Sequence, residues 1–443
     1  MALSCRARRA IAAAAFGGKA DILISNLTTL FGLGVQKFSC GMGKIKGMCR
    51  FLAVFGLIVG LVFVPAFAQG PSGNATQFEA FLNELWPQAK ARGITRATFD
   101  VAFAGITPDP RVIAAIDRQP EFNEPMGNYL STIVAPGNIA VGMHKASQWS
   151  SILGAVEKRF GVDRPIIVAI WGMESSYGAE KDRWDLFRSL ATLAEIKFRQ
   201  PFFRDELLTA LEILQDGHLT RDRLTSSWAG AMGQPQFMPS TFEKYAVDFS
   251  GDGVADVWTN VPDVLSSMAN YLHDKGWQLG VPWGFEVVVP HGFEYRRSRA
   301  TYPEWLKLGV RRADNATFPA DGVGILFFPS GSSGPAFIAT DNYSVIKQYN
   351  NSDAYALAVG LLADRLQGQR PMRAAWPRDE HPISRQSRIA LQQKLAGLGY
   401  RMNDFEGHID FDMRDSIRDV QVKLSMIPDG CPNQALLQAL GIK

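Results

Sequence analysis

The sequence predicts a mainly α-helical protein that carries a small β-containing insertion and ends in a compact helical module. First, apolar residues recur with helical spacing in several long segments, including 78–104, 146–160 and 192–217. Second, the chain changes character between residues 282 and 337, where short runs rich in aromatic and β-branched residues are typical of strands. Third, a segment with three prolines and three arginines, 367–382, has the composition of a linker before the C-terminal stretch.

The charge distribution excludes some classes of function. The 443 residues are 47% hydrophobic and 20% charged, which is ordinary for a globular protein. The formal net charge of +3 arises in the first 68 residues, which hold eight basic groups and one acidic group. The remaining chain has 38 basic and 42 acidic groups, and such a slightly acidic body argues against bulk nucleic-acid binding. Three of the four cysteines also lie in the first 68 residues, so Cys431 cannot form a disulfide within the body.

Residues 1–68 are predicted to be a leader. A run of fourteen uncharged, almost wholly apolar residues, 51–64, follows three basic residues and precedes an Ala-Phe-Ala site that ends at Ala68. This order is typical of a secretory signal peptide cut after Ala68, which predicts export to the periplasm. The run is shorter than the roughly 20 residues of a spanning helix, and an uncleaved leader that anchors the chain in the membrane is the alternative. Because the segment before the run is long for a signal peptide, Met42 or Met48 is a candidate true start.

The stretch that carries the most chemical information is 171–178, at the end of an uncharged apolar run. An Asp-x-Pro sequence before the run is typical of a helix start, and Gly178 is typical of a left-handed helix end. Glu174 would then lie in the last turn of a buried helix. Apolar surroundings disfavour a charged carboxylate, so we expect a raised pKa for Glu174, as a general acid needs. The alternative is a structural glutamate at the exposed end of a core helix.

Residues 227–242 form a second unusual stretch. Its small residues let the backbone approach a ligand or a neighbouring segment closely, while Ser227, Gln234 and Gln236 can form hydrogen bonds. Ser240 precedes a short helix-like segment and is a candidate helix cap. The alternative is a glycine-rich tight connection between two helices.

An acidic loop follows at residues 248–256. Asp248, Ser250 and Asp252 place oxygen side chains at alternate positions with glycine at the sixth, as in the first half of an EF-hand calcium loop. The twelfth position is Thr259 instead of glutamate, and Asp263 is a later candidate ligand if the loop is longer. A turn rich in aspartate and glycine without a metal is the alternative.

The chain after residue 282 contains the predicted strands and the last helices. The predicted strands are 285–290, 324–329 and 336–339. The predicted helices are 353–366 before the linker, and 384–396, 413–424 and 434–440 after it.

Three blocks in this order resemble the membrane-bound lytic murein transglycosylase B family. They are Trp-Gly-Met-Glu at 171–174, Ala-Gly-Ala-Met-Gly with Gln-Phe-Met-Pro-Ser within 229–240, and Tyr-Asn-Asn-Ser at 349–352. The resemblance covers residues from about 78 to 366, and it implies a lysozyme-like (α+β) catalytic domain whose fold is related to goose-type lysozyme.

The C-terminal stretch resembles the helical peptidoglycan-binding domain, although Val420 stands where that family usually has phenylalanine. The expected domain organisation is a leader at 1–68, a catalytic domain at 69–366, a linker at 367–382 and a three-helix peptidoglycan-binding domain at 383–443.

The resemblance implies a lytic transglycosylase, a carbon–oxygen lyase with Glu174 as its only acid and base. Glu174 would protonate the β-1,4 glycosidic oxygen between N-acetylmuramic acid and N-acetylglucosamine. It would then take the proton of the muramyl C6 hydroxyl, which closes a 1,6-anhydro ring. A glycosidase with two carboxylates needs a second acid nearby, and none lies in the three blocks. The alternatives are a non-catalytic peptidoglycan-binding scaffold and a hydrolytic muramidase.

The resemblance also implies binding residues. The expected substrate contacts are Ser227, Gln236, Tyr271, Tyr349, Asn350 and Tyr355. The expected ligands of a structural calcium ion, which the chemistry itself does not require, are Asp248, Ser250, Asp252, Asp263 and the Val254 carbonyl. Glu180 and Asp182 are expected to be solvated charges. The expected partners are peptidoglycan glycan strands, with proteins of cell-wall synthesis as further candidates and the oligomeric state left open.

Overall fold

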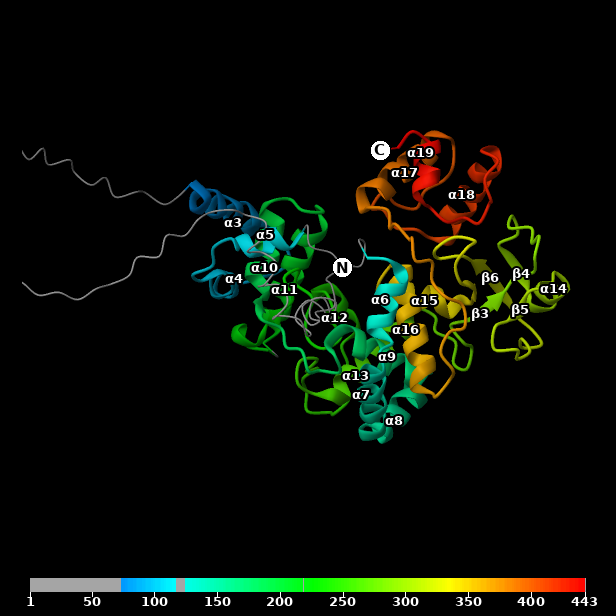
Figure 1. The fold of residues 1–443 in the computed structure, drawn as a ribbon. Helices are drawn as coiled ribbons and strands as arrows, with labels where there is room; N and C mark the ends of the chain where they lie inside the picture. The colour runs from blue at the N-terminus through cyan, green and yellow to red at the C-terminus, as the bar shows by residue number, and fades with distance from the viewer. Residues whose placement is uncertain (1–72, 117–123, 218, 443) are drawn as a thin grey trace, which may run out of the picture.

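The computed structural model describes residues 73–116, 124–217 and 219–442, so the predicted leader at 1–68 lies outside it. In this part of the chain, no helix combines the length and the apolar character that crossing a membrane requires. The molecule has four regions: in Figure 1 an N-terminal lobe lies on the left, a central bundle in the middle and a sheet insertion on the right, and a C-terminal module lies above the bundle and the sheet.

The N-terminal lobe is helical and has its own apolar core, which includes Phe99, Phe187 and Leu211. Its helices are α3 (Gly73–Ala91), α4 (Arg96–Phe103), α5 (Pro110–Ile116), α10 (Leu186–Glu195), α11 (Phe202–Asp216), the 3-10 helix η2 (Arg221–Arg223) and α12 (Pro239–Tyr245). A two-stranded antiparallel ribbon joins β1 (Trp184–Asp185) to β2 (Thr225–Ser226). The prediction that Ser240 caps a helix is wrong, because Ser240 lies inside α12 and donates to Glu206 from its amide and its hydroxyl.

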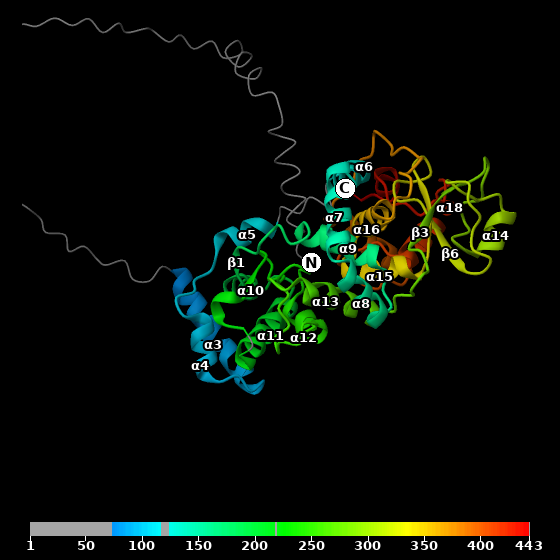
Figure 2. The same cartoon turned by 90° about the horizontal axis from the view of Figure 1, so that it is seen from below.

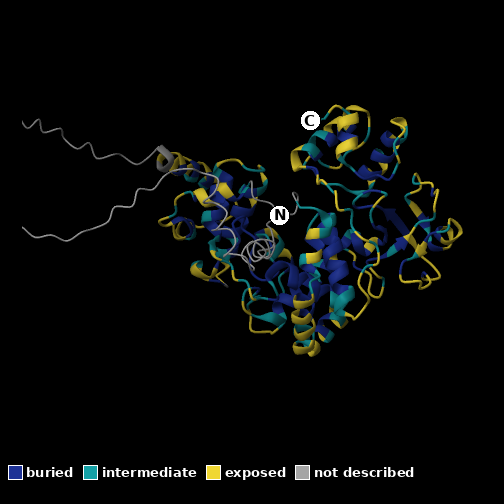
Figure 3. Cartoon of the chain, in the orientation of Figure 1, coloured by how far each residue is buried: buried dark blue, intermediate teal, exposed yellow. Residues whose placement is uncertain are grey.

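The central bundle surrounds α9. Its helices are α6 (Met126–Ile133), α7 (Pro136–Gln148), α8 (Ser150–Phe160), α9 (Arg164–Ser175), α13 (Val261–Asp274), α15 (Asp341–Tyr349) and α16 (Asp353–Leu366). Every residue of α9 from Ile166 to Ser175 is buried, and α7, α13 and α16 pack around it. A helix that is apolar on all sides suits this position. The two views place the bundle between the N-terminal lobe and the sheet (Figures 1 and 2), and Figure 3 shows how the buried residues fill its interior.

The sheet insertion is a five-stranded antiparallel sheet in the order β4-β6-β7-β3-β5. Its elements are β3 (Gly284–Val288), β4 (Arg299–Thr301), α14 (Tyr302–Lys307), β5 (Arg311–Arg312), β6 (Val323–Phe327) and β7 (Ala336–Ala339). In the register, Ile338 pairs with Phe285 on one side and Leu326 on the other. The three predicted strands are confirmed within two residues, whereas β4 and β5 were not predicted.

The C-terminal module consists of α17 (Arg385–Gly397), α18 (Phe411–Lys423) and α19 (Gln434–Ala439), close to the three predicted helices. Leu391, Ile417 and Leu436 are fully buried in its own small core. The predicted fold class, mainly α with a small β insertion and a three-helix C-terminal module, is therefore confirmed.

Candidate active site

Glu174 lies in the last turn of α9, as predicted. The helix begins directly after Asp163, whose side chain makes no cap hydrogen bond but accepts one from Trp277 Nε1 at 2.8 Å. The helix ends at Ser175, so the predicted end at Gly178 is three residues late.

A left-handed turn follows the end of α9 at Ser175. Ser176 and Tyr177 have φ angles of 52° and 59°, which residues other than glycine adopt only at a cost in conformational energy. The Tyr177 ring packs edge-on against Trp171, with 5.9 Å between the ring centroids. A Cβ atom at Gly172 would lie 2.6 Å from Cζ of Tyr177, so glycine is needed for the ring to lie there.

A tyrosine hydroxyl holds the carboxyl group of Glu174. The glutamate is buried, and its Oε1 accepts a hydrogen bond from the Tyr355 hydroxyl at 2.6 Å. Burial and the negative charge of Glu174 together raise the pKa of Tyr355 well above its usual value, and the same two causes raise the pKa of Tyr349. Both hydroxyls therefore stay protonated at neutral pH, and their near-parallel rings lie 6.5 Å apart.

Glu174 lines a pocket of about 80 Å³. The predicted substrate contacts that share this lining are Gln236, Tyr271, Tyr349 and Asn350. The lining residues that were not predicted are Phe237, Met238 and Thr241. All three belong to the unusual stretch 227–242, whose composition is the signal that could have identified them. Among the described residues that line this pocket, Glu174 is the only acid.

Aromatic rings form one wall of the pocket. The centroids of Phe237, Tyr271 and Tyr349 are 5.0 to 5.9 Å apart, in tilted and edge-on pairs. The hydroxyls of Tyr349 and Tyr271 donate to backbone carbonyls, of Pro235 at 2.8 Å and of Gln348 at 2.6 Å. These bonds fix the ring faces, which are suited to contact sugar rings.

Asp182 is not the solvated charge that the sequence predicts. It is partly buried, and its two oxygens accept from the Gly233 amide at 2.6 Å and from Gln236 Nε2 at 3.0 Å. Burial raises the pKa of Asp182 to about 7, although the two hydrogen bonds oppose this shift. Gln236 itself has a φ of 54°, so Asp182 helps to hold a strained residue that lines the pocket.

Ser227 is not among the residues that line the pocket. Its hydroxyl accepts from the Ala231 amide at 3.1 Å, and its own amide donates to the Ala231 carbonyl at 2.7 Å. Ser227 therefore closes the turn that precedes the pocket wall.

The acidic loop is organised by hydrogen bonds. Asp248 accepts from the amides of Gly251, Asp252 and Gly253, which lower its pKa. Asp263 is fully buried, and its two oxygens accept from three further backbone amides in the loop. Within the described chain, no three histidine, cysteine or acidic side chains gather in an arrangement that could hold a metal ion. The oxygens of Asp248, Ser250, Asp252 and Asp263 are of the kind that calcium prefers, and both oxygens of Asp248 and of Asp263 already accept from backbone amides.

Two family models match the chain. The model of the transglycosylase SLT domain matches residues 77–364, and the model of the peptidoglycan binding domain matches residues 384–440. The membrane-bound lytic murein transglycosylase B of Escherichia coli (strain K12) is 31% identical over 243 residues, which are 52% of this chain and 64% of that relative.

Solved structures give the same picture. SltB3 from Pseudomonas aeruginosa, in complex with NAG-anhNAM-pentapeptide, is 44% identical with a TM-score of 0.74, and the match covers 82% of this chain and 99% of SltB3. The Escherichia coli lytic transglycosylase SLT35, in complex with calcium, is 26% identical with a TM-score of 0.55, over 68% of this chain and 94% of SLT35. The lysozyme-like fold class is thereby confirmed. Because the SLT model matches well over half of the residues, the chain belongs to the transglycosylase SLT domain family.

Proposed function

We propose that the protein is a lytic transglycosylase that cleaves the β-1,4 bond between N-acetylmuramic acid and N-acetylglucosamine in peptidoglycan. The observation that carries the proposal is the site itself, where one buried carboxyl group is held by Tyr355 beside a pocket of tyrosines and amides. The family supports the reaction, and the sugar–peptide complex of SltB3 supports the substrate class.

Glu174 acts first as an acid and then as a base. The protonated carboxyl gives its proton to the glycosidic oxygen as the bond to the muramyl C1 atom breaks. The resulting carboxylate takes the proton of the C6 hydroxyl, whose oxygen bonds to C1 and closes the 1,6-anhydro ring. Because the sugar supplies the nucleophile, the absence of a second acid from the pocket lining fits this reaction better than a two-carboxylate hydrolysis.

Four pocket residues are the proposed substrate contacts. The amides of Gln236 and Asn350 suit N-acetyl groups, and the faces of Tyr271 and Tyr349 suit sugar rings. Tyr355 acts on the substrate through its bond to Glu174. A contact from Ser227 stays a prediction without support from the pocket lining.

The two family matches support a division of labour along the chain. Residues 69–366 would carry the reaction, 367–382 would link, and 383–443 would bind peptidoglycan glycan strands. The basic and apolar segments before Ala68 support export to the periplasm, with an uncleaved anchor as the alternative. Proteins of cell-wall synthesis are candidate partners.

The test of the reaction is a digest of purified murein sacculi with residues 69–443, read by mass spectrometry. Products that end in 1,6-anhydro-muramyl groups are expected. Reducing ends would instead identify a muramidase. Intact sacculi that retain the protein would identify a scaffold.

Replacing Glu174 by glutamine tests the residue. The amide cannot donate or accept the proton in the same way, so turnover should fall by about 10² to 10⁴-fold. The melting temperature and the binding to sacculi should stay close to those of the wild type. Unchanged turnover in Glu174→Gln would remove this residue from the mechanism.

We also propose that the loop at 248–256 binds calcium through Asp248, Ser250, Asp252 and the Val254 carbonyl, with Asp263 as a weaker candidate ligand because its side chain is fully buried. Calcium in excess over a chelator should raise the melting temperature, since an ion that binds only the folded state stabilises it. Asp248→Asn should abolish this rise. Magnesium serves as the control cation, and equal melting temperatures with calcium and with chelator would contradict the proposal.

A further inference from the structure

The C-terminal module contacts the central bundle through a buried group of charges. Asp353 accepts from Lys347 Nζ at 2.9 Å and from Arg414 of the module at 2.7 Å. Lys347 also donates to the Ile409 carbonyl of the module at 2.7 Å. The side chains of Asp353 and Arg414 are only 9% and 4% exposed, so neither charge is compensated by water. Burial alone would raise the pKa of Asp353, but Lys347 and Arg414 lower it well below its usual value.

Asp353 is the first residue of α16 and lies in the chain between a pocket residue and the tyrosine that holds Glu174. The loop before it contains Asn350, which lines the catalytic pocket. Two residues after it comes Tyr355, which donates to Glu174. Ser352 caps the same helix by accepting from the Tyr355 amide. Asp353 therefore lies within the segment 350–355, which begins with a pocket residue and ends with the tyrosine that holds Glu174.

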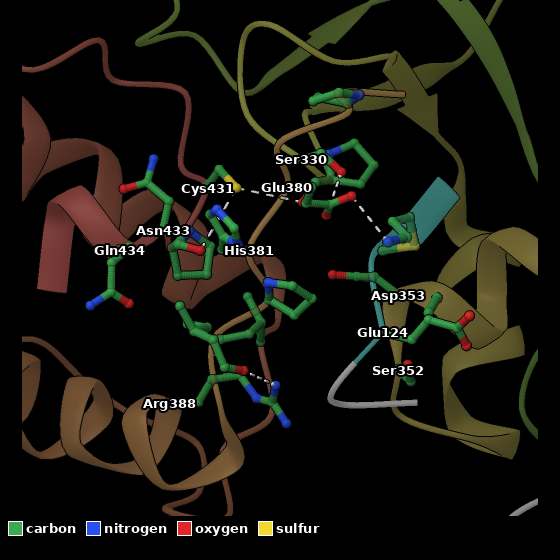
Figure 4. A pocket seen from close by; sticks show the side chains of 18 of the residues that line it. Glu124, Ser330, Ser352, Asp353, Glu380, His381, Arg388, Cys431, Asn433 and Gln434 are labelled. Atoms are coloured by element: carbon green, nitrogen blue, oxygen red, sulfur yellow. Dashed lines mark hydrogen bonds between the residues drawn. The ribbon is translucent and has the colours of Figure 1, made fainter. Parts of the chain in front are cut away.

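The other side of the segment faces the module. A cavity of about 360 Å³ lies between bundle and module, and its lining includes Ser352 and Asp353 on one side and Arg388 and Asn433 on the other. Figure 4 shows these side chains around the cavity, with those of the module opposite those of the bundle. The loop that lines the catalytic pocket at Asn350 thus continues into a segment that the module contacts.

We propose that Arg414 of the C-terminal module is a positioning residue for catalysis, which fixes the start of α16 through Asp353 and thereby holds Tyr355 against Glu174. This inference rests on the proposed function of the site. It gives the module a second role besides wall binding, because the catalytic domain would need the docked module to keep the carboxyl group of Glu174 correctly placed. Small displacements of a positioned group reduce turnover strongly, even when the altered residue lies far from the substrate.

The chain offers a matched control on the same helix. Arg418 lies one turn after Arg414, is equally buried, and also docks the module, but it donates to the Leu326 carbonyl of β6 at 3.0 Å. Arg414→Met and Arg418→Met therefore each remove one buried docking contact of α18, and only the first one touches Asp353. The full chain from residue 69 is used for both variants.

Steady-state kinetics on a short soluble glycan fragment, which needs no wall binding, separates the two roles. Arg414→Met should lower kcat by about tenfold or more. Its KM should change by no more than about twofold, because most substrate contacts stay in place. Arg418→Met should keep a kcat near that of the wild type. Equal losses in the two variants, or no loss in either, would overturn the proposal.

Two further measurements keep the outcome clear. Arg414→Lys retains the charge beside Asp353, so it should restore most of the turnover even if Arg414→Met folds poorly. Hydrogen exchange of the peptide that spans residues 349–357 reads the segment without any reaction. It should become faster in Arg414→Met and stay unchanged in Arg418→Met. A wild type without 1,6-anhydro products would refute the proposed function, and the exchange data would still decide whether Arg414 positions the segment.

Discussion

The carboxyl groups of Glu174 and Asp182 differ in the hydrogen bonds that they accept. Glu174 accepts from the hydroxyl of a tyrosine, whereas Asp182 accepts from the Gly233 amide and the Gln236 side chain. Asp182 does not line the pocket, yet it holds a residue that does. Its function is therefore positional, and its raised pKa gives a way to test this.

Asp182→Asn should change how stability depends on pH. Since the folded-state pKa of about 7 lies above the usual 3.8, protonation of Asp182 stabilises the fold at low pH, and this contribution is lost as the pH rises through about 7. The asparagine is neutral at every pH. We therefore expect the melting temperature of the variant, relative to the wild type, to rise by roughly 2 °C between about pH 5 and about pH 8.

Asp182→Ala is the comparison for this experiment. Alanine removes both acceptors, so that variant should be less stable than the wild type at both pH values. Parallel pH curves for the wild type and Asp182→Asn would show that the carboxyl group of Asp182 titrates as in the unfolded chain. Such a result would leave the position of Gln236 without this support.

The sequence correctly placed Glu174 in the last turn of a buried helix, and the family resemblance named four other residues that line the same pocket, but neither predicted the burial of Asp182. The apolar run and the blocks around Glu174 are local patterns, which can be read from neighbouring residues. The burial of Asp182 comes from a loop some fifty residues further along, whose close approach no local pattern shows. Ser227 illustrates the reverse case, since its position in a block could not show that its hydroxyl turns into its own loop.

The elements were predicted best where one face or one period dominates. The helix predicted at 353–366 coincides with α16, and the three strands with apolar residues were found within two residues. The strands β4 and β5 were missed because they are short and contain Arg299, Arg311 and Arg312. They become strands through pairing with β6 and β3, which is a tertiary effect.

Helix packing around the candidate active site depends on Gly142, and we expect opposite effects from alanine at this position and at Gly154. A Cβ atom at Gly142 in α7 would lie 2.5 Å from the Tyr177 hydroxyl and 2.6 Å from Cδ2 of Leu366. Gly142→Ala should therefore cost roughly 1–3 kcal/mol of unfolding free energy through overpacking. Because Tyr177 supports the turn after Glu174, turnover should fall as well.

Gly154 in the neighbouring helix α8 is the matched control. A Cβ atom there would meet nothing within 4 Å. Gly154→Ala should then stabilise the protein by up to about 1 kcal/mol, because alanine has the higher helix propensity. Urea denaturation measures both variants, and a stabilised Gly142→Ala would contradict the packing around Tyr177.

At the scale of the whole molecule, the module docks through a few charged side chains and through Phe411, which packs against Phe327 and Tyr343. Arg414 and Arg418 reach the bundle and the sheet, and Glu406 pairs with Arg199 of the N-terminal lobe. The sequence predicts a linker and a separate set of helices, but it does not predict this docking. Buried arginines on an amphipathic helix look like solvated charges until their distant partners are known.

The accessibility of Cys431 reports whether the C-terminal module unfolds together with the catalytic domain. Its thiol is buried between the module and the sheet insertion, 3.5 Å from the Pro329 carbonyl, and burial raises its pKa to about 12.

The chain offers two separate probes of unfolding. In a chain that begins at residue 69, Cys431 is the only cysteine, and all ten tryptophans lie before the module. Because the docking contacts include the buried Asp353–Arg414 pair and the packing of Phe411 against Phe327, we expect thiol labelling and tryptophan fluorescence to change at the same urea concentration. Arg414→Met, which breaks one pair, should expose the thiol at a lower urea concentration than the tryptophans. Rapid labelling of the native wild type would mean that the module is not docked in solution. Arg414 could then not position Tyr355 through Asp353.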